Sequence, residues 1–166
     1  TVDLIDTKTV GRAERVAQLL DQMPDAYVAS PYDDRLVIDG NATLGDELAA
    51  KNFDVVIVPV GGGGLISGTI AAFSKNGHKP DVYGAEPLLG NDAARSFRSG
   101  QLTVNESEPM TLADGARTLS LGNLNWPIIQ NGATDIVEVS EDRIAEALRL
   151  YFRLANLKCE PTGALS

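Results

Sequence analysis

Four consecutive glycines, Gly61–Gly64, stand between two apolar segments of the sequence, Val55–Val60 and Leu65–Phe73. Without Cβ atoms, successive backbone N–H groups can converge on one point, and a ligand can approach the main chain closely. A helix that begins directly after such a loop adds its own free N–H groups and the positive end of its dipole. The glycines therefore predict an anion-binding site, with phosphate as the expected occupant.

Two interpretations without a ligand stay open from the residues alone. Gly61–Gly64 could be a flexible linker or a tight turn. Linkers, however, usually join polar flanks, whereas these glycines join two segments that both favour burial.

The nucleotide-binding motifs do not fit the loop. A Walker A motif would end in Gly-Lys-Ser/Thr, but Gly68 is followed directly by Thr69. The G-x-G-x-x-G pattern would need a glycine where Ile66 or Ser67 stands. Ser67 is not in a G-x-S-x-G elbow either, because Leu65 lies two residues before it. A phosphate site without these signatures suits a small phosphorylated cofactor.

A second group of residues could bind a metal ion. Glu86 and Asp92 lie six residues apart after a predicted strand, with Gly90 between them. Carboxylate and backbone oxygens are the ligands of hard divalent cations such as Mg²⁺ and Ca²⁺. The alternative is a solvated acidic turn in which Asp92 caps the helix that follows.

Other candidate residues are given no catalytic role. His78, the only histidine, lies in the polar loop NGHKP, far from the other motifs. Cys159 is expected in a buried strand as a core residue, and Trp126 is expected to serve packing. A single cysteine forms no intrachain disulfide, so a reducing compartment, the cytoplasm, is the expected location.

The elements that must position these residues alternate between strand and helix. Strands are predicted at 2–6, 26–29, 54–60, 81–86 and 134–139, and helices at 11–22, 41–51, 65–75, 91–100 and beyond Ser140. This alternation predicts an α/β fold with a largely parallel sheet and helices on both faces. Ligands of such folds bind beyond the carboxyl ends of the strands, where the glycines lie.

Composition excludes several partners. The chain has 166 residues and a formal net charge of −9, with 14 basic residues among 23 acidic ones, so no nucleic-acid partner is expected. Residues 55–74 carry no charge and are long enough to span a membrane. Pro59 and the glycines would break such a helix at its centre, so no membrane partner is expected.

Five segments of the chain resemble parts of one enzyme family. VPVGGGGLISG resembles the phosphate-binding loop of fold type II pyridoxal-phosphate enzymes, the tryptophan synthase β family. PYDDRLVIDGNATLGDEL is similar to the family's segment that enters the large domain. The four-glycine loop resembles that of the serine racemase and serine/threonine dehydratase group, and GAEP, LADGARTLSLGNLNWPII and CEPTGA are similar to motifs of the same group.

The resemblance implies roles for individual residues. The cofactor phosphate would be held by the backbone of Gly61, Gly62, Gly63, Gly64 and Leu65. Gly115 would lie against the pyridoxal ring and Glu160 would face the cofactor pocket. From the residues alone, Glu160 could equally be a structural carboxylate. The resemblance also implies that Glu86, the Gly90 carbonyl and Asp92 bind Mg²⁺ or Ca²⁺.

The resemblance also shows what the chain lacks. The family's Schiff-base lysine would lie upstream of the segment matching Thr1, and none of the five lysines stands in a matching motif. The chain is therefore expected to be a fragment, with residues 1–33 as the tail of the small domain. Residues 34–166 would be the core of the large cofactor-binding domain without its C-terminal elements, leaving apolar sheet surface uncovered.

The function implied is that of a fragment of a pyridoxal-phosphate-dependent serine/threonine dehydratase, which gives a 2-oxo acid and ammonia, or of a serine racemase. The substrate would be L-serine, L-threonine or a related β-hydroxy amino acid, the intact enzyme a homodimer, and this chain inactive alone. The alternatives are a non-catalytic module that binds phosphate or cofactor, and one half of a split enzyme.

Overall fold

The computed structural model describes residues 2–6 and 9–166, and Lys8 lies outside them. Its centre is a sheet of three parallel strands in the order β1 (Val55–Pro59), β2 (Asp81–Pro87) and β3 (Asp135–Val139). Each parallel neighbour requires a crossover, and helices supply it. The predicted α/β fold with a parallel sheet is thereby confirmed.

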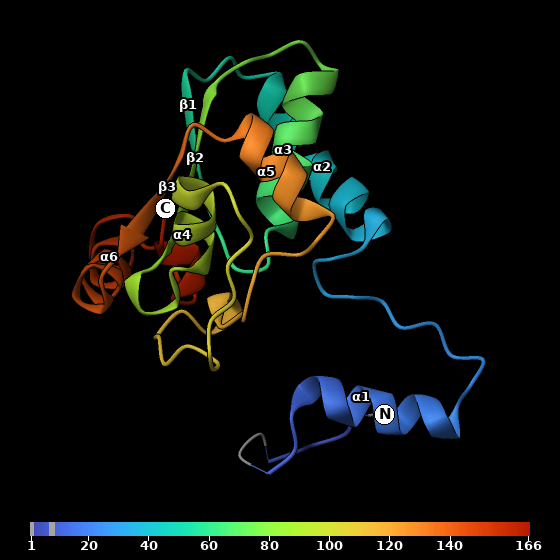
Figure 1. Cartoon of the computed structure of the whole chain (residues 1–166). Coiled ribbons are helices and arrows are strands. Elements are labelled where there is room, and N and C mark those ends of the chain that lie inside the picture. Colours follow the sequence, from blue (N-terminus) through green and yellow to red (C-terminus); the bar gives the residue numbers. More distant parts are fainter. Residues whose placement is uncertain (1, 7–8) are drawn as a thin grey trace.

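Helices lie on both faces of this sheet (Figure 1). The α-helices of the described residues are α1 (Arg12–Gln22), α2 (Arg35–Ala49), α3 (Gly64–Lys75), α4 (Asp92–Ser99), α5 (Asn125–Gly132) and α6 (Glu141–Leu154). Three 3-10 turns complete the order, at η1 (Leu88–Gly90), η2 (Asp114–Ala116) and η3 (Thr162–Ala164). In Figure 1, α2, α3 and α5 lie to one side of the strands and α6 to the other.

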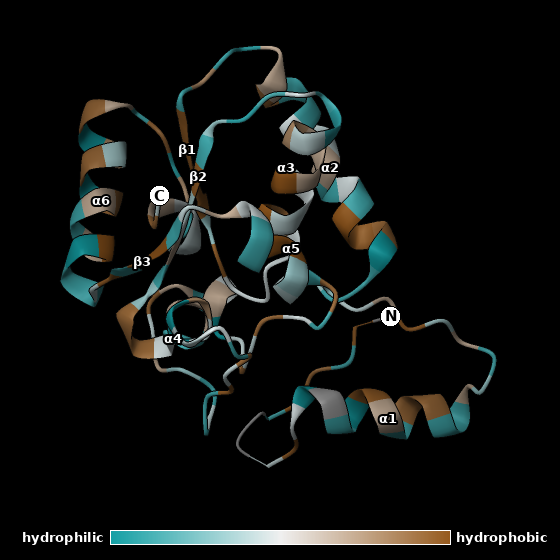
Figure 2. Cartoon of the chain, turned by 45° about the horizontal axis from the view of Figure 1, so that its top comes forward, coloured by the Kyte–Doolittle hydropathy of each residue, from teal (hydrophilic) through white to brown (hydrophobic). Residues whose placement is uncertain are grey.

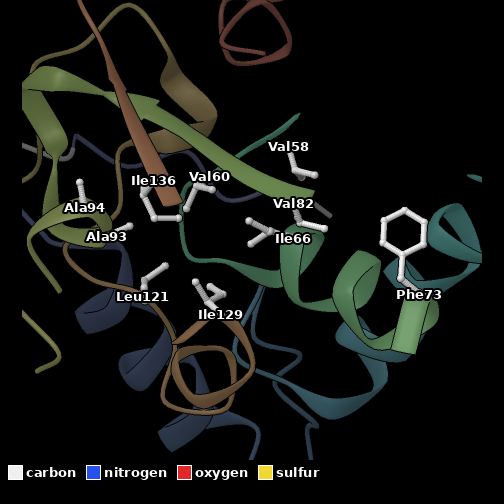
Figure 3. Packing of buried hydrophobic residues seen from close by; sticks show 10 residues of the cluster. All are labelled: Val58, Val60, Ile66, Phe73, Val82, Ala93, Ala94, Leu121, Ile129 and Ile136. Atoms are coloured by element: carbon white, nitrogen blue, oxygen red, sulfur yellow. The ribbon is translucent and has the colours of Figure 1, made fainter. Parts of the chain in front are cut away.

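The main core fills the space between the sheet and the helices α3 and α5. Alternate strand residues such as Val58, Val82 and Ile136 point toward this side, as a pleated strand requires. Ile66 of α3 and Ile129 of α5 meet them from the helices, and Figure 3 shows these side chains converging. The glycine loop begins at the edge of this core, so well-packed side chains hold both of its ends.

The opposite face of the sheet is covered only in part. Ile144 of α6 packs with Ala85 and Leu165 in a smaller cluster. Val55, Ile57 and Val137 remain 51%, 50% and 46% exposed. Figure 2 shows the hydrophobic residues along β1 and on α6. The apolar sheet surface expected from the sequence is therefore present.

The N-terminal segment stands apart from the sheet. Figure 1 shows α1 separated from the main body and joined to α2 by an extended stretch. An exposed ion pair, with 3.7 Å between Arg12 Nη2 and Glu108 Oε1, links it to the body. The division of the chain at residue 33 stays a prediction.

Several expected elements differ from the structure. No strand forms at residues 2–6 or 26–29, because no neighbouring strand in the described part of the chain offers them a hydrogen-bonding edge. The helix expected at 41–51 begins at Arg35, because the Asp34 carboxylate accepts the Leu36 N–H and caps it. No helix among the described residues is long and apolar enough to cross a membrane.

Candidate functional site

The glycine loop lies at the carboxyl end of β1 and leads directly into α3. Gly63 takes the N-cap position of α3 with φ of 92°, a left-handed conformation that glycine adopts without strain. None of the backbone N–H groups of residues 61–65 donates a hydrogen bond to another residue that the structure describes. The loop and the first turn of α3 therefore present a row of free donors, as an anion site requires.

A cavity of about 450 Å³ opens in front of this loop. All seven residues expected to contact a cofactor border it: Gly61, Gly62, Gly63, Gly64, Leu65, Gly115 and Glu160. The other bordering residues are Pro31, Tyr32, Asn41, Pro59, Thr162 and Gly163. The volume is within the range of small-ligand sites. The structure thus brings distant motifs to one place, while their contact with a cofactor stays a prediction.

Close packing also requires the glycines. A Cβ on Gly62 would lie 2.2 Å from the ring of Tyr32, and a Cβ on Gly61 would lie 2.8 Å from the Gly115 carbonyl oxygen. A Cβ on Gly63 would lie 2.8 Å from Ile129 Cδ1. The loop is consequently a tightly packed segment and not a flexible linker.

Sequence reasoning missed the residues that anchor the loop from behind. The Gly62 carbonyl accepts hydrogen bonds from the Gly122 N–H and from Nδ2 of Asn125, both at 2.9 Å. Nearby, the Asp33 carboxylate accepts the backbone N–H groups of Asn123 at 3.0 Å and Leu124 at 2.8 Å. These contacts span some 60 to 90 positions of sequence, so no local pattern could have indicated them.

Glu160 borders the cavity but already has backbone partners. Its two carboxylate oxygens accept the N–H groups of Thr162 at 2.7 Å and Gly163 at 2.8 Å, which closes the turn η3. Thr162 Oγ1 in turn accepts the Gly115 N–H at 2.9 Å. Glu160 therefore has the structural role that the residues allowed, in a position that faces the cavity.

Glu86 and Asp92 lie close together in a buried acidic site. The Glu86 carboxylate, at the end of β2, accepts the N–H groups of Ala93 at 3.1 Å and Ala94 at 2.6 Å. It thus takes the helix-capping role that the alternative interpretation gave to Asp92. Asp92 Oδ1 accepts from Asn105 Nδ2 at 2.8 Å, whereas Asp92 Oδ2 is buried without a hydrogen-bond partner in the described part of the chain.

Burial shapes the protonation of both acids. Burial raises the pKa of Glu86 to about 8, helped by the charge of Asp92 and opposed by the N–H groups of Ala93 and Ala94. Burial likewise raises the pKa of Asp92 to about 6, against the hydrogen bond from Asn105. Among the described residues, no group of three or more His, Cys, Asp or Glu side chains is arranged to hold a metal ion. The candidate set here is two carboxylates and the Gly90 carbonyl in η1.

The remaining polar candidates lie elsewhere. His78 is not part of the cavity wall: its ring packs edge-on against Phe73, and its Nε2 is 3.1 Å from the Phe53 carbonyl oxygen. Cys159 was expected in a buried strand, and that prediction is wrong. The residue is exposed and belongs to no strand, because no neighbouring strand covers residues 157–160. Trp126 packs against the main core, as predicted.

Comparison with known proteins agrees with this geometry. A family model described as pyridoxal-phosphate dependent enzyme matches residues 1–166. The chain belongs to this family. It is 37% identical over 155 residues to a serine racemase of Schizosaccharomyces pombe, covering 92% of this chain and 48% of the relative. It is also 37% identical over 169 residues to an L-threo-3-hydroxyaspartate ammonia-lyase of Pseudomonas sp, covering 99% of this chain and 52% of the relative.

Solved structures of the family share the fold. A threonine deaminase of T.th. matches with a TM-score of 0.85 and 41% identity, covering 92% of this chain and 53% of the other. The serine racemase of Dictyostelium discoideum matches with a TM-score of 0.81 and 36% identity, covering 93% of this chain and 49% of the racemase chain. The chain thus spans about half the length of the family members it matches.

Substitution of the loop glycine with positive φ is expected to weaken both fold and site. Gly63→Ala should lower the free energy of unfolding by about 1–2 kcal/mol, because a Cβ disfavours the left-handed conformation. Gly40→Ala is the matched control. Gly40 lies inside α2 with nothing within 4 Å of its added Cβ, so this variant should gain about 0.5–1 kcal/mol. Urea unfolding measures the free energy of unfolding of both variants. The same change in both variants would contradict the packing described for the loop.

The buried acids predict a pH-dependent stability. Because the pKa of Glu86 is about 8 in the folded chain and near 4.5 when unfolded, the folded state holds a proton that the unfolded state has lost between these values. Stability from this group is complete below pH 4.5 and is lost as pH rises toward 8, by at most about 1.4 kcal/mol per pH unit.

Urea unfolding in the presence of a chelator between pH 5 and 8 measures this loss. Glu86→Gln, whose side chain stays neutral, is expected to flatten the plot of unfolding free energy against pH. Glu146→Gln on the exposed surface of α6 should leave it unchanged. A profile that is flat in the unaltered chain would refute the burial cost assigned to Glu86.

Proposed function

We propose that this chain forms the phosphate-binding core of the cofactor domain of a serine/threonine dehydratase or serine racemase. The observation that carries the proposal is the row of free N–H groups of residues 61–65, at the carboxyl end of β1 and at the edge of a 450 Å³ cavity. Family membership and the similarity to racemases and ammonia-lyases support it.

The residues present fit pyridoxal phosphate. The backbone of Gly61–Gly64 and Leu65 would hold the phosphate, because these residues border the cavity and none of their N–H groups donates a hydrogen bond to another described residue. The positive end of α3 adds to the attraction for a dianion. Gly115 would leave space for the ring, and Glu160 stands at the cavity edge. When bound, pyridoxal phosphate supplies an electron sink for the electrons of a bond broken at the substrate Cα.

The chain's own part is to bind and orient the phosphate end of the cofactor. No lysine belongs to the described cavity wall, so the chain alone is expected to bind the cofactor reversibly and to turn over no substrate. In the whole protein the substrate would be L-serine, L-threonine or a related β-hydroxy amino acid. Loss of the β-hydroxyl would give a 2-oxo acid and ammonia, and reprotonation on the opposite face would give the enantiomer.

A split enzyme is the second candidate. The chain covers about half the length of the relatives it matches. The sheet face that bears Val55, Ile57 and Val137 is exposed to solvent. A partner polypeptide that brings a lysine would complete the site, and its co-purification with this chain would favour this arrangement. A non-catalytic cofactor-binding module would bind the cofactor without such a partner.

The test compares this chain with any longer product of the same gene, each incubated with pyridoxal phosphate. Borohydride reduction followed by intact-mass analysis should show a cofactor adduct at one lysine only in the longer protein. L-serine and L-threonine assays should show turnover only there. If this chain alone forms the adduct and turns over either amino acid, the proposed need for a lysine from outside the chain is wrong. If neither protein binds the cofactor, the function is wrong.

We also propose a divalent cation at Glu86, Gly90 and Asp92. Two buried carboxylates close together are costly without a counter-charge, and the unpartnered Asp92 Oδ2 offers a free ligand atom. The backbone carbonyl of buried Gly90 would complete a set of oxygen ligands suited to Mg²⁺ or Ca²⁺.

Metal binding should be visible as added stability. MgCl₂ or CaCl₂ at millimolar concentration is expected to raise the melting temperature of the unaltered chain at pH 8, because binding favours the folded state. Asp92→Asn should abolish this rise, while Asp39→Asn on the exposed surface of α2 should retain it. A rise that is equal in all three proteins would indicate a general salt effect and would exclude this site.

Location and assembly complete the proposal. The single cysteine, Cys159, is exposed and suits a reducing cytoplasm. The intact enzyme is proposed to be a homodimer, which light scattering of a longer product would test directly.

A further inference from the structure

Asn125 is a fully buried polar residue at the start of α5, and it is not part of the cavity wall. Its Nδ2 donates to two backbone carbonyls, that of Gly62 in the loop and that of Tyr32 in the segment before α2, both at 2.9 Å. One side chain therefore ties the loop to a segment 30 residues earlier in the sequence.

The chemistry of the contacts determines how the amide is oriented. A reversed amide would direct its oxygen at two carbonyl oxygens, which would repel it. Nδ2 therefore faces the carbonyls of Gly62 and Tyr32, and Oδ1 is buried without a hydrogen-bond partner within the described residues. Such an unpaired oxygen costs stability. The donor group, in contrast, has two backbone acceptors at good hydrogen-bond distance, which points to a role for the donor.

That role follows from the planarity of the peptide bond. The carbonyl of Gly62 and the N–H of Gly63 belong to one trans peptide unit and point in opposite directions. Asn125 Nδ2 and the Gly122 N–H together hold the Gly62 carbonyl away from the cavity. The Gly63 N–H is consequently held toward the cavity. Glycine has the freedom to rotate this peptide plane, so the loop needs an external contact to fix it.

We propose that Asn125 is a positioning residue for the anion site: through the Gly62 carbonyl it fixes the Gly63 N–H toward the bound phosphate. Asn125 touches no ligand itself and acts only through the loop. This inference rests on the proposed function, because it takes the phosphate of the cofactor as the anion. It adds a residue from α5 to a site that the loop sequence alone would assign to the glycines.

The test measures affinity with and without the phosphate group. Pyridoxine 5′-phosphate and pyridoxine are suitable probes, because they lack the aldehyde that reacts with lysines. Titrations use the full chain, unaltered and as Asn125→Leu and Asn125→Asp. The Leu variant keeps the volume and removes the donor, and the Asp variant replaces the donor by an acceptor. Each variant should bind pyridoxine 5′-phosphate about tenfold more weakly, with its pyridoxine affinity unchanged.

Matched variants at Asn131 control for the chemistry of the change. Asn131 is exposed on the same helix, and its Nδ2 donates to the Pro127 carbonyl within α5. Asn131→Leu and Asn131→Asp should therefore keep the affinity ratio of the unaltered chain. A variant that only folds less well would lose apparent affinity for both probes by the same factor. A changed ratio of the two affinities therefore indicates an effect on the phosphate site and not on folding.

A spectroscopic measurement covers the case in which one variant folds poorly. In the chain labelled with ¹⁵N-glycine, inorganic phosphate should shift the amide resonance of Gly63, and the shift should be lost in whichever Asn125 variant remains folded. An unchanged ratio and an unchanged Gly63 shift in the variants would overturn the role of Asn125 while leaving the proposed function intact. If the unaltered chain itself shows no preference for the phosphorylated probe, the phosphate site fails and the role of Asn125 fails with it.

Discussion

The close approach of three chain segments to the loop Gly61–Gly64 is the constraint on which the rest of the site depends. Tyr32 lies against Gly62 from one side, Gly115 contacts Gly61 from another, and Ile129 and Asn125 lie behind. These neighbours leave no space for a Cβ on Gly61, Gly62 or Gly63. The glycines thus serve two purposes at once, since the geometry that admits these neighbours also leaves the N–H groups of residues 61–65 without an acceptor in the described part of the chain. The packing that excludes a Cβ therefore also leaves backbone donors available at the edge of the cavity.

The acidic site formed by Glu86 and Asp92 buries two carboxyl groups, and burying them costs folding free energy. Glu86 and Asp92 are both buried, and burial is the largest cause of the raised pKa of each. Their surroundings offset part of that cost through the N–H groups of α4 and the amide of Asn105. Glu138 nearby is different: its hydrogen bond from Asn91 and its ion pair with Arg98 lower its pKa. Glu138 therefore has an ion-pair partner at the rim of this region, whereas Glu86 and Asp92 form no ion pair within the described residues.

One face of the sheet leaves apolar residues exposed to solvent. Helices α3 and α5 cover one face fully, while α6 and the turn η3 cover the other only near Ala85 and Ile144. Apolar residues of β1 and β3 remain in contact with solvent, and they are a candidate surface for association. The family members that the chain resembles are about twice as long as the chain.

The sequence by itself determined the strand–loop–helix unit around the glycines and the parallel α/β class. These follow from local patterns: a β-branched run, four residues without Cβ and an apolar helix are all adjacent in the chain. Only the tertiary structure decided how the loop is held. Tyr32 and Asn125 meet it from distant positions, and an isolated asparagine before Trp126 gives no periodic signal. It also decided that Glu86, and not Asp92, caps α4, because that choice depends on where β2 ends in space. Short-range propensity misplaced the segments 2–6 and 26–29 as strands, since a strand forms only where a neighbouring edge is available to pair with it.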